Sequence, residues 1–118
     1  MIAIYGLKNC DTCRKAMKWL DGQSIPYRFH DVRSDGLEPA KVNGWIKAAG
    51  LEALVNRRSA TWRNLDDSAR TEAMGPTAKA FLAAHATLIK RPVIEVEDQV
   101  LVGFTSLIED LLRGQALK

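Results

Sequence analysis

The sequence predicts an α/β domain, because a strand, a helix and a second strand follow one another within its first third. Residues 2–5 are β-branched or aromatic and stop at Gly6, which is typical of a short buried strand. Residues 10–20 carry apolar side chains at helical spacing, and residues 25–32 alternate as a second strand does. These elements together span about 30 residues, the size of a βαβ unit.

The middle of the chain is predicted to be helical. Residues 38–49 form a helix that closes before glycine, and residues 51–55 form a short turn or helix. Residues 66–74 and 77–89 give two more helical segments with apolar stripes. We therefore expect a helical insertion at about residues 37–89.

The last third returns to strands. Residues 92–96 and 100–102 are apolar and flank a polar turn, so they predict a hairpin. Thr105 is expected to cap a closing helix at 106–113, which Gly114 ends. The order βαβ, helical block, ββα is that of a thioredoxin-like fold with a helical insertion, in a single domain covering the whole chain.

Composition excludes several classes of protein. The chain has 118 residues, of which 47% are hydrophobic and 26% charged, values ordinary for a soluble domain. Its net charge of +3 is spread along the chain and does not indicate nucleic-acid binding. No apolar run approaches the roughly 20 residues that cross a bilayer, and the N-terminus does not resemble a signal peptide. We expect a cytoplasmic protein that binds neither membrane nor nucleic acid.

Both cysteines lie in one Cys-x-x-Cys motif, between the first strand and the first helix. In the cytosol such a pair is more often catalytic, redox-sensing or metal-binding than structural. Cys10 would lie at the helix N-terminus, where backbone N–H groups and the helix dipole favour the thiolate. Lys8 and Arg14 add positive charge, and Cys13 lies one turn further, close enough to resolve a mixed disulfide on Cys10.

Two other interpretations of the cysteine pair are weaker alternatives. Cys10 and Cys13 could be buried neighbours without chemistry. A zinc site would usually need four ligands, and His30 and His85 are too far apart in the sequence to provide the usual paired spacing, so we expect no metal.

Several segments resemble one protein family along essentially the whole chain. Residues 4–16, Ile-Tyr-Gly-Leu-Lys-Asn-Cys-Asp-Thr-Cys-Arg-Lys-Ala, resemble the opening of the arsenate reductases of the ArsC family, of the bacterial regulator Spx and of the reductase-like YffB proteins. Residues 88–94 resemble the family's Arg-Pro segment, and residues 53–59 its middle arginine segment. Residues 27–31 and 61–65 make the YffB branch the closest match.

The resemblance implies roles for single residues. Cys10 matches the nucleophile, Arg91 an arginine that lies over the cysteine and binds an anion, and Pro92 a cis-proline beside the site. A further anion-binding arginine aligns with Asn56, so its role passes to one of the two arginines beside it. The expected catalytic residues are Cys10, Cys13 and Arg91, and the expected substrate-binding residues are Lys8, Asn9, Arg14, Arg57, Arg58 and Pro92.

This sequence also departs from the arsenate reductases. Their third anion-binding arginine falls near Gly103, where this chain offers no charge, and they work with one essential cysteine where this chain has a second, as Spx does. Both departures weaken a specific assignment to arsenate and leave thiol chemistry intact.

Two functions follow as hypotheses. The first is a glutathione-dependent thiol reductase with no bound cofactor, which uses glutathione as reductant or co-substrate and has glutaredoxin as a further partner. The alternative is a redox-sensing regulator like Spx, which binds RNA polymerase. The sequence leaves open whether arsenate, a glutathione adduct or a protein disulfide is reduced, and it does not indicate the oligomeric state.

Overall fold

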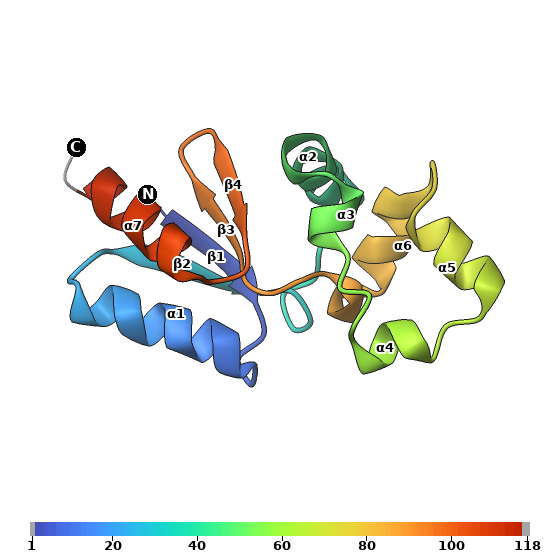
Figure 1. Cartoon of the computed structure of the whole chain (residues 1–118), viewed down its shortest axis with the longest axis horizontal. Coiled ribbons are helices and arrows are strands. Elements are labelled where there is room, and N and C mark those ends of the chain that lie inside the picture. Colours follow the sequence, from blue (N-terminus) through green and yellow to red (C-terminus); the bar gives the residue numbers. More distant parts are fainter. Residues whose placement is uncertain (1, 117–118) are drawn as a thin grey trace. The chain divides into compact units, whose positions relative to one another are not determined.

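The computed structural model describes residues 2–116, which form two compact units (Figure 1). The first unit combines the residues up to Asp35 with those from Arg91 onward, and it contains the whole sheet. The second unit, Gly36–Lys90, is built from helices. Among residues 2–116 no helix is both long enough and apolar enough to span a membrane.

Four strands form the sheet of the first unit: β1 (Ile2–Gly6), β2 (Tyr27–Asp31), β3 (Val93–Val96) and β4 (Gln99–Val102), in the order β2-β1-β3-β4. The strands β1 and β2 are parallel, whereas β3 runs antiparallel to both β1 and β4. In this register Ile4 lies between Phe29 and Ile94. This topology confirms the predicted thioredoxin-like fold, including the hairpin of β3 and β4.

Two helices pack with one face of this sheet: α1 (Asp11–Gly22) and α7 (Ser106–Ala116) (Figure 1). Side chains from β1, β3 and both helices meet in one buried cluster, since alternate strand residues point to the same face. Its buried members are Ile2, Ile4, Leu20, Ile25, Ile94, Val96, Ile108 and Leu112. Burial of each large apolar side chain contributes about 1.5–3 kcal/mol, so this cluster holds α1, and with it the cysteine motif, against the sheet.

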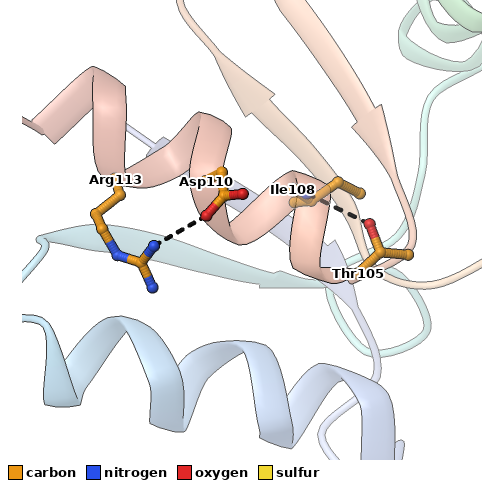
Figure 2. A network of polar contacts seen from close by, with 4 residues as sticks. All are labelled: Thr105, Ile108, Asp110 and Arg113. Carbon is orange, nitrogen blue, oxygen red and sulfur yellow. Dashed lines mark hydrogen bonds and ion pairs between the residues drawn. The ribbon is translucent and has the colours of Figure 1, made fainter.

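The closing helix begins as predicted and ends later. The Oγ1 atom of Thr105 accepts a hydrogen bond from the backbone N–H of Ile108 at 3.3 Å, and Arg113 pairs with Asp110 at 3.0 Å one turn apart (Figure 2). The prediction that Gly114 ends the helix is wrong, because α7 continues to Ala116. Gly114 does not adopt the positive φ with which glycine terminates helices, and a helical glycine costs only about 1 kcal/mol.

The second unit holds short helices around its own core. They are α2 (Pro39–Ala49), α3 (Leu51–Leu54), α4 (Ala60–Arg63), α5 (Asp67–Ala73), α6 (Ala78–Ala84) and the 3-10 helix η1 (Ala86–Leu88). Trp45 is 1% exposed and the side chains of Val42, Leu54 and Leu82 are fully buried, so this unit has an apolar interior of its own. Gly50, at φ 89°, ends α2 as predicted.

Two predictions in this unit need correction. Residues 77–89 do not form one helix: α6 ends at Ala84, and η1 follows after His85. The reason is that Leu88 accepts a hydrogen bond from the N–H of Asn56 at 2.7 Å, and Lys90 donates one to Leu54 at 2.7 Å, so this backbone pairs across the unit. Helix α4 was not predicted, since a single turn shows no helical periodicity.

Candidate active site

Cys10 stands at the junction of a turn and a helix. Strand β1 is followed by a turn that leads into α1 (Figure 1). The strand ends at Gly6 and the helix starts at Asp11, so Cys10 is the N-cap residue of α1, in an extended conformation. Its N–H donates to the carbonyl of Leu7 at 3.2 Å, and its carbonyl accepts from Arg14 at 2.9 Å. Cys10 therefore stands next to the first backbone N–H groups of the helix, which have no partner within the helix itself.

The surroundings of Cys10 favour its thiolate. Burial of the half-exposed thiol raises its pKa, but four hydrogen bonds act in the opposite direction. They come from the backbone N–H and the side chain of Cys13, from the side chain of Arg91 and from the backbone N–H of Thr12. The hydrogen bonds outweigh burial, and the pKa of Cys10 lies below its ordinary value. A lowered pKa is what an attacking thiol needs at neutral pH.

Cys13 differs from Cys10 in its burial and in the direction of its pKa shift. Its side chain is fully buried, and burial raises the pKa of its thiol, opposed in part by a hydrogen bond from the backbone of Leu7. The neighbouring Cys10 raises the pKa further. Cys10 therefore loses its proton at a lower pH than Cys13, and the Cys13 thiol can donate a hydrogen bond to the Cys10 thiolate.

Gly6 makes room for this arrangement. A Cβ atom at position 6 would collide with the Sγ atom of Cys13 and would lie 3.4 Å from its Cβ atom. The last residue of β1 is thus a glycine because the buried thiol packs directly onto the strand backbone.

Arg91 and Pro92 open the segment that leads into β3. The peptide bond between them is cis, which confirms the geometry that the family resemblance implied. Pro92 is buried, and its carbonyl accepts a hydrogen bond from Gly103 at 2.8 Å, beyond the end of β4. The half-buried Arg91 hydrogen-bonds the Cys10 sulfur, so the residues predicted to be catalytic do meet in the first unit.

The predicted substrate-binding residues are distributed over both units. Lys8, Asn9 and Arg14 are exposed in the turn before α1 and in its first helical turn, and Arg14 pairs with Asp11 at 3.5 Å. Arg57 and Arg58 are exposed residues of the second unit. The roles of all five in substrate binding stay predictions.

The middle arginine segment has an ordered backbone. Asn56 accepts a hydrogen bond from the N–H of Arg58 at 3.1 Å, and the carbonyl of Arg58 accepts one from Arg63 at 2.7 Å. These contacts leave the guanidinium of Arg58 exposed on a structured turn. Such a guanidinium can bind carboxylate or phosphate groups in a bidentate manner.

Sequence reasoning overlooked one residue beside the cysteine turn, Asp31. This side chain is only 6% exposed, and its carboxylate accepts three backbone hydrogen bonds. Oδ2 accepts from Lys8 at 3.0 Å, while Oδ1 accepts from Arg33 at 2.9 Å and from Ser34 at 3.0 Å. The bond from Ser34 is the largest of the causes that lower the pKa of Asp31, to about 2. An aspartate followed by Val-Arg-Ser could have suggested the local turn, but no sequence pattern shows the bond to Lys8.

Residues 2–116 contain no group of three His, Cys, Asp or Glu side chains arranged to hold a metal ion. The two histidines are engaged in ring contacts instead. His30 lies 5.0 Å from the ring of Tyr5, and His85 lies 4.4 Å from the ring of Phe81, centroid to centroid.

Comparison with known proteins places this geometry in a family. The model of the ArsC family matches residues 5–107. An uncharacterized protein of Haemophilus influenzae is 45% identical over 104 residues, which cover 88% of this chain and 91% of that protein. The residues that the family model matches span both cysteines and the Arg-Pro segment, and the predicted resemblance to the ArsC family is confirmed.

Two solved structures and a transcriptional regulator are also similar to this chain. The solved structure of a YFFB protein matches with a TM-score of 0.84 at 34% identity, and the match covers 95% of this chain and 98% of that one. An arsenate reductase (ArsC) related protein of Brucella melitensis has a TM-score of 0.74 at 34% identity, with 93% and 92% covered. The global transcriptional regulator Spx of Listeria innocua is 26% identical over 117 residues, 96% of this chain and 85% of Spx. This chain belongs to the ArsC family.

Proposed function

We propose that this chain is a glutathione-dependent thiol reductase, related to the arsenate reductases, in which the Cys10 thiolate is the nucleophile. The observation that carries the proposal is the contrast within the cysteine pair. One thiol has a lowered pKa at a helix N-terminus, and the other is a buried proton donor beside it. Structural cysteines need no such difference in pKa, whereas a nucleophilic thiolate paired with a resolving thiol does.

The reaction with a glutathione mixed disulfide illustrates the proposed chemistry. The Cys10 thiolate attacks the sulfur of the glutathionyl group, the substrate's own thiolate leaves, and Cys10 carries the glutathione in a new mixed disulfide. A second glutathione thiolate then attacks this bond, releases oxidised glutathione and restores Cys10. One free glutathione is consumed in each cycle, because the other half of the oxidised glutathione is the glutathionyl group that the substrate carried.

Cys13 offers a second way to complete the cycle. Its thiol could lose its proton and attack the mixed disulfide, which would release glutathione and leave a disulfide between Cys10 and Cys13. The high pKa of Cys13 makes it a slow nucleophile until the Cys10 thiolate has been consumed, because the charge on Cys10 is one cause of that pKa. A resolving role would therefore begin only after Cys10 has reacted.

Arg91 is proposed first to stabilise the Cys10 thiolate and then to bind an anionic group of the substrate. Its guanidinium hydrogen-bonds the Cys10 sulfur, and a guanidinium keeps its charge at any working pH. The same group would bind a carboxylate of glutathione or an oxyanion as the substrate approaches. We propose Arg58 or Arg57 as a further anion contact and Lys8, Asn9, Arg14 and Pro92 as the remaining substrate-binding residues.

A steady-state assay tests the proposal. Glutathione, glutathione reductase and NADPH would be supplied, with arsenate or a small glutathione mixed disulfide as the substrate, and wild type would be compared with Cys10→Ser and Cys13→Ser. We expect turnover that disappears in Cys10→Ser. Retention in Cys13→Ser would assign resolution to glutathione, and loss would assign it to Cys13. The absence of turnover by wild type on both substrates would refute the proposed reductase.

A regulator of the Spx type is the second candidate, because Spx proteins match nearly the whole chain and this chain also has two cysteines in one motif. In that case a disulfide between Cys10 and Cys13 would be a switch, and the partner would be RNA polymerase. Capture of purified RNA polymerase by the oxidised but not the reduced protein would support it. We propose a cytoplasmic location for either function, with glutaredoxin as a further partner of the reductase.

A further inference from the structure

The buried carboxylate of Asp31, at the end of β2, hydrogen-bonds the backbone of the turn that leads to Cys10. Strand β2 ends at this residue, next to the end of β1, and the N–H of Val32 donates to the carbonyl of Gly6 at 2.9 Å. The sheet thus extends one hydrogen bond beyond the paired strands. Asp31 is positioned by this extension to reach the residues that follow Gly6.

One peptide group connects the carboxylate to the nucleophile. The N–H of Lys8 donates to Oδ2 of Asp31 at 3.0 Å. The carbonyl of Leu7 belongs to the same planar peptide group, and it accepts the N–H of Cys10 at 3.2 Å. Rotation of this plane would break both bonds together, so the bond to Asp31 also orients the backbone of Cys10.

We infer that Asp31 is a positioning residue for the nucleophile: its carboxylate holds the Leu7–Lys8 peptide group so that the Cys10 sulfur stays aimed at the N–H groups of α1 and at Arg91. The inference rests on the proposed role of Cys10 as the nucleophile and deepens it.

The two carboxylate oxygens accept hydrogen bonds from different parts of the backbone, which makes a sharp test possible. Oδ1 accepts the backbone N–H groups of Arg33 and Ser34, within the local turn, while Oδ2 reaches across to the N–H of Lys8. The side chain of Ser34 also hydrogen-bonds the carboxylate, again within the local turn. In Asp31→Asn the amide oxygen can keep the two local bonds, and the NH₂ group then faces the N–H of Lys8, donor against donor. This substitution removes the link to the cysteine turn and keeps the side chain's shape.

The sign of the effect separates positioning from simple electrostatics. Removal of a negative charge near a thiol would, acting through space, lower the pKa of that thiol. Loss of positioning weakens the hydrogen bonds to the Cys10 sulfur while burial continues to oppose its ionisation, so the pKa of Cys10 rises. A purely structural role would lower the stability of the protein and leave this pKa where it is.

The experiment measures the rate of Cys10 alkylation by iodoacetamide against pH, with peptide mass spectrometry to identify the labelled cysteine. The control is Asp35→Asn, which removes the same charge from the same turn: Asp35 is exposed and accepts the N–H of Asp31 at 3.1 Å. We expect Asp31→Asn to raise the pKa of Cys10 by half a unit or more, so that alkylation below that pKa slows about threefold or more. Asp35→Asn should give the wild-type profile.

An unchanged or lowered pKa of Cys10 in folded Asp31→Asn would overturn the inference, as would an equal rise in Asp35→Asn. If Asp31→Asn fails to fold, amide hydrogen exchange in the wild type decides. The Lys8 amide should exchange as slowly as the amides of the sheet, and exchange at the rate of an unfolded chain would overturn the inference. Neither measurement needs glutathione or a substrate, so failure of the turnover assay would not be confused with failure here.

Discussion

Gly6→Ala should destabilise the protein through a single contact. The new Cβ atom would overlap the Sγ atom of Cys13, whose side chain is fully buried and cannot move into solvent. Overpacking of this kind costs about 1–3 kcal/mol. Since φ at Gly6 is not positive, alanine brings no backbone strain, and its smaller unfolded-state entropy returns about 0.5–1 kcal/mol. The net loss of unfolding free energy should be about 1–2 kcal/mol.

The same substitution should become harmless once the sulfur is removed. In Cys13→Ala the nearest remaining atoms to the new methyl group are the Cβ atom of residue 13 at 3.4 Å and Cε1 of Phe29 at 3.8 Å. Gly6→Ala in that background should therefore be neutral or slightly stabilising, which gives a coupling energy of about 2 kcal/mol between the two positions. Urea unfolding followed by tryptophan fluorescence, with midpoints compared at constant m-value, measures each corner of the cycle. Additive effects of the two substitutions would refute the packing argument.

Three further predictions concern stability. The pKa of Asp31 is lowered from 3.8 to about 2, so this carboxylate contributes stability that is complete above about pH 4 and is lost as the pH falls toward 2. Urea unfolding should show that wild type loses about 2 kcal/mol of unfolding free energy over this range and that Asp31→Asn does not. Equal acid profiles of the two proteins would contradict this prediction. Gly44→Ala, inside α2 with no atom near the new methyl group, should raise the free energy of unfolding by about 0.5–1 kcal/mol, and a lower thermal midpoint would count against it. Thr105→Ala removes the cap of the Ile108 N–H (Figure 2) and should cost about 1 kcal/mol, whereas Thr105→Ser should retain most of that stability.

Local patterns in the sequence were sufficient for the elements that carry the cysteines. A β-branched run before Gly6 and the apolar stripe after Cys10 predicted β1 and α1, because a buried strand and an amphipathic helix each have their own periodicity. The polar turn at 97–99 likewise predicted the hairpin of β3 and β4. These features depend on residues that are close together in the chain.

The features that escaped prediction depend on distant residues. The helix expected at 77–89 breaks at His85 because Leu88 and Lys90 pair with backbone more than thirty positions earlier. The hydrogen bond between Asp31 and Lys8 joins residues 23 positions apart, and neither residue type by itself predicts that bond. The cis peptide before Pro92 came from the family resemblance, since X-Pro bonds are mostly trans and nothing local marks the exception.

The central claim, that Cys10 is an activated thiolate held by hydrogen bonds, is tested most directly by the pH dependence of its alkylation in wild type and in Arg91→Ala. The account predicts that Cys10 is labelled before Cys13 and that its pKa in wild type lies below the ordinary value of a cysteine thiol. Arg91→Ala should raise this pKa, because a hydrogen bond to the sulfur is lost. A pKa of Cys10 at or above the ordinary value, or labelling of Cys13 first, would contradict the account.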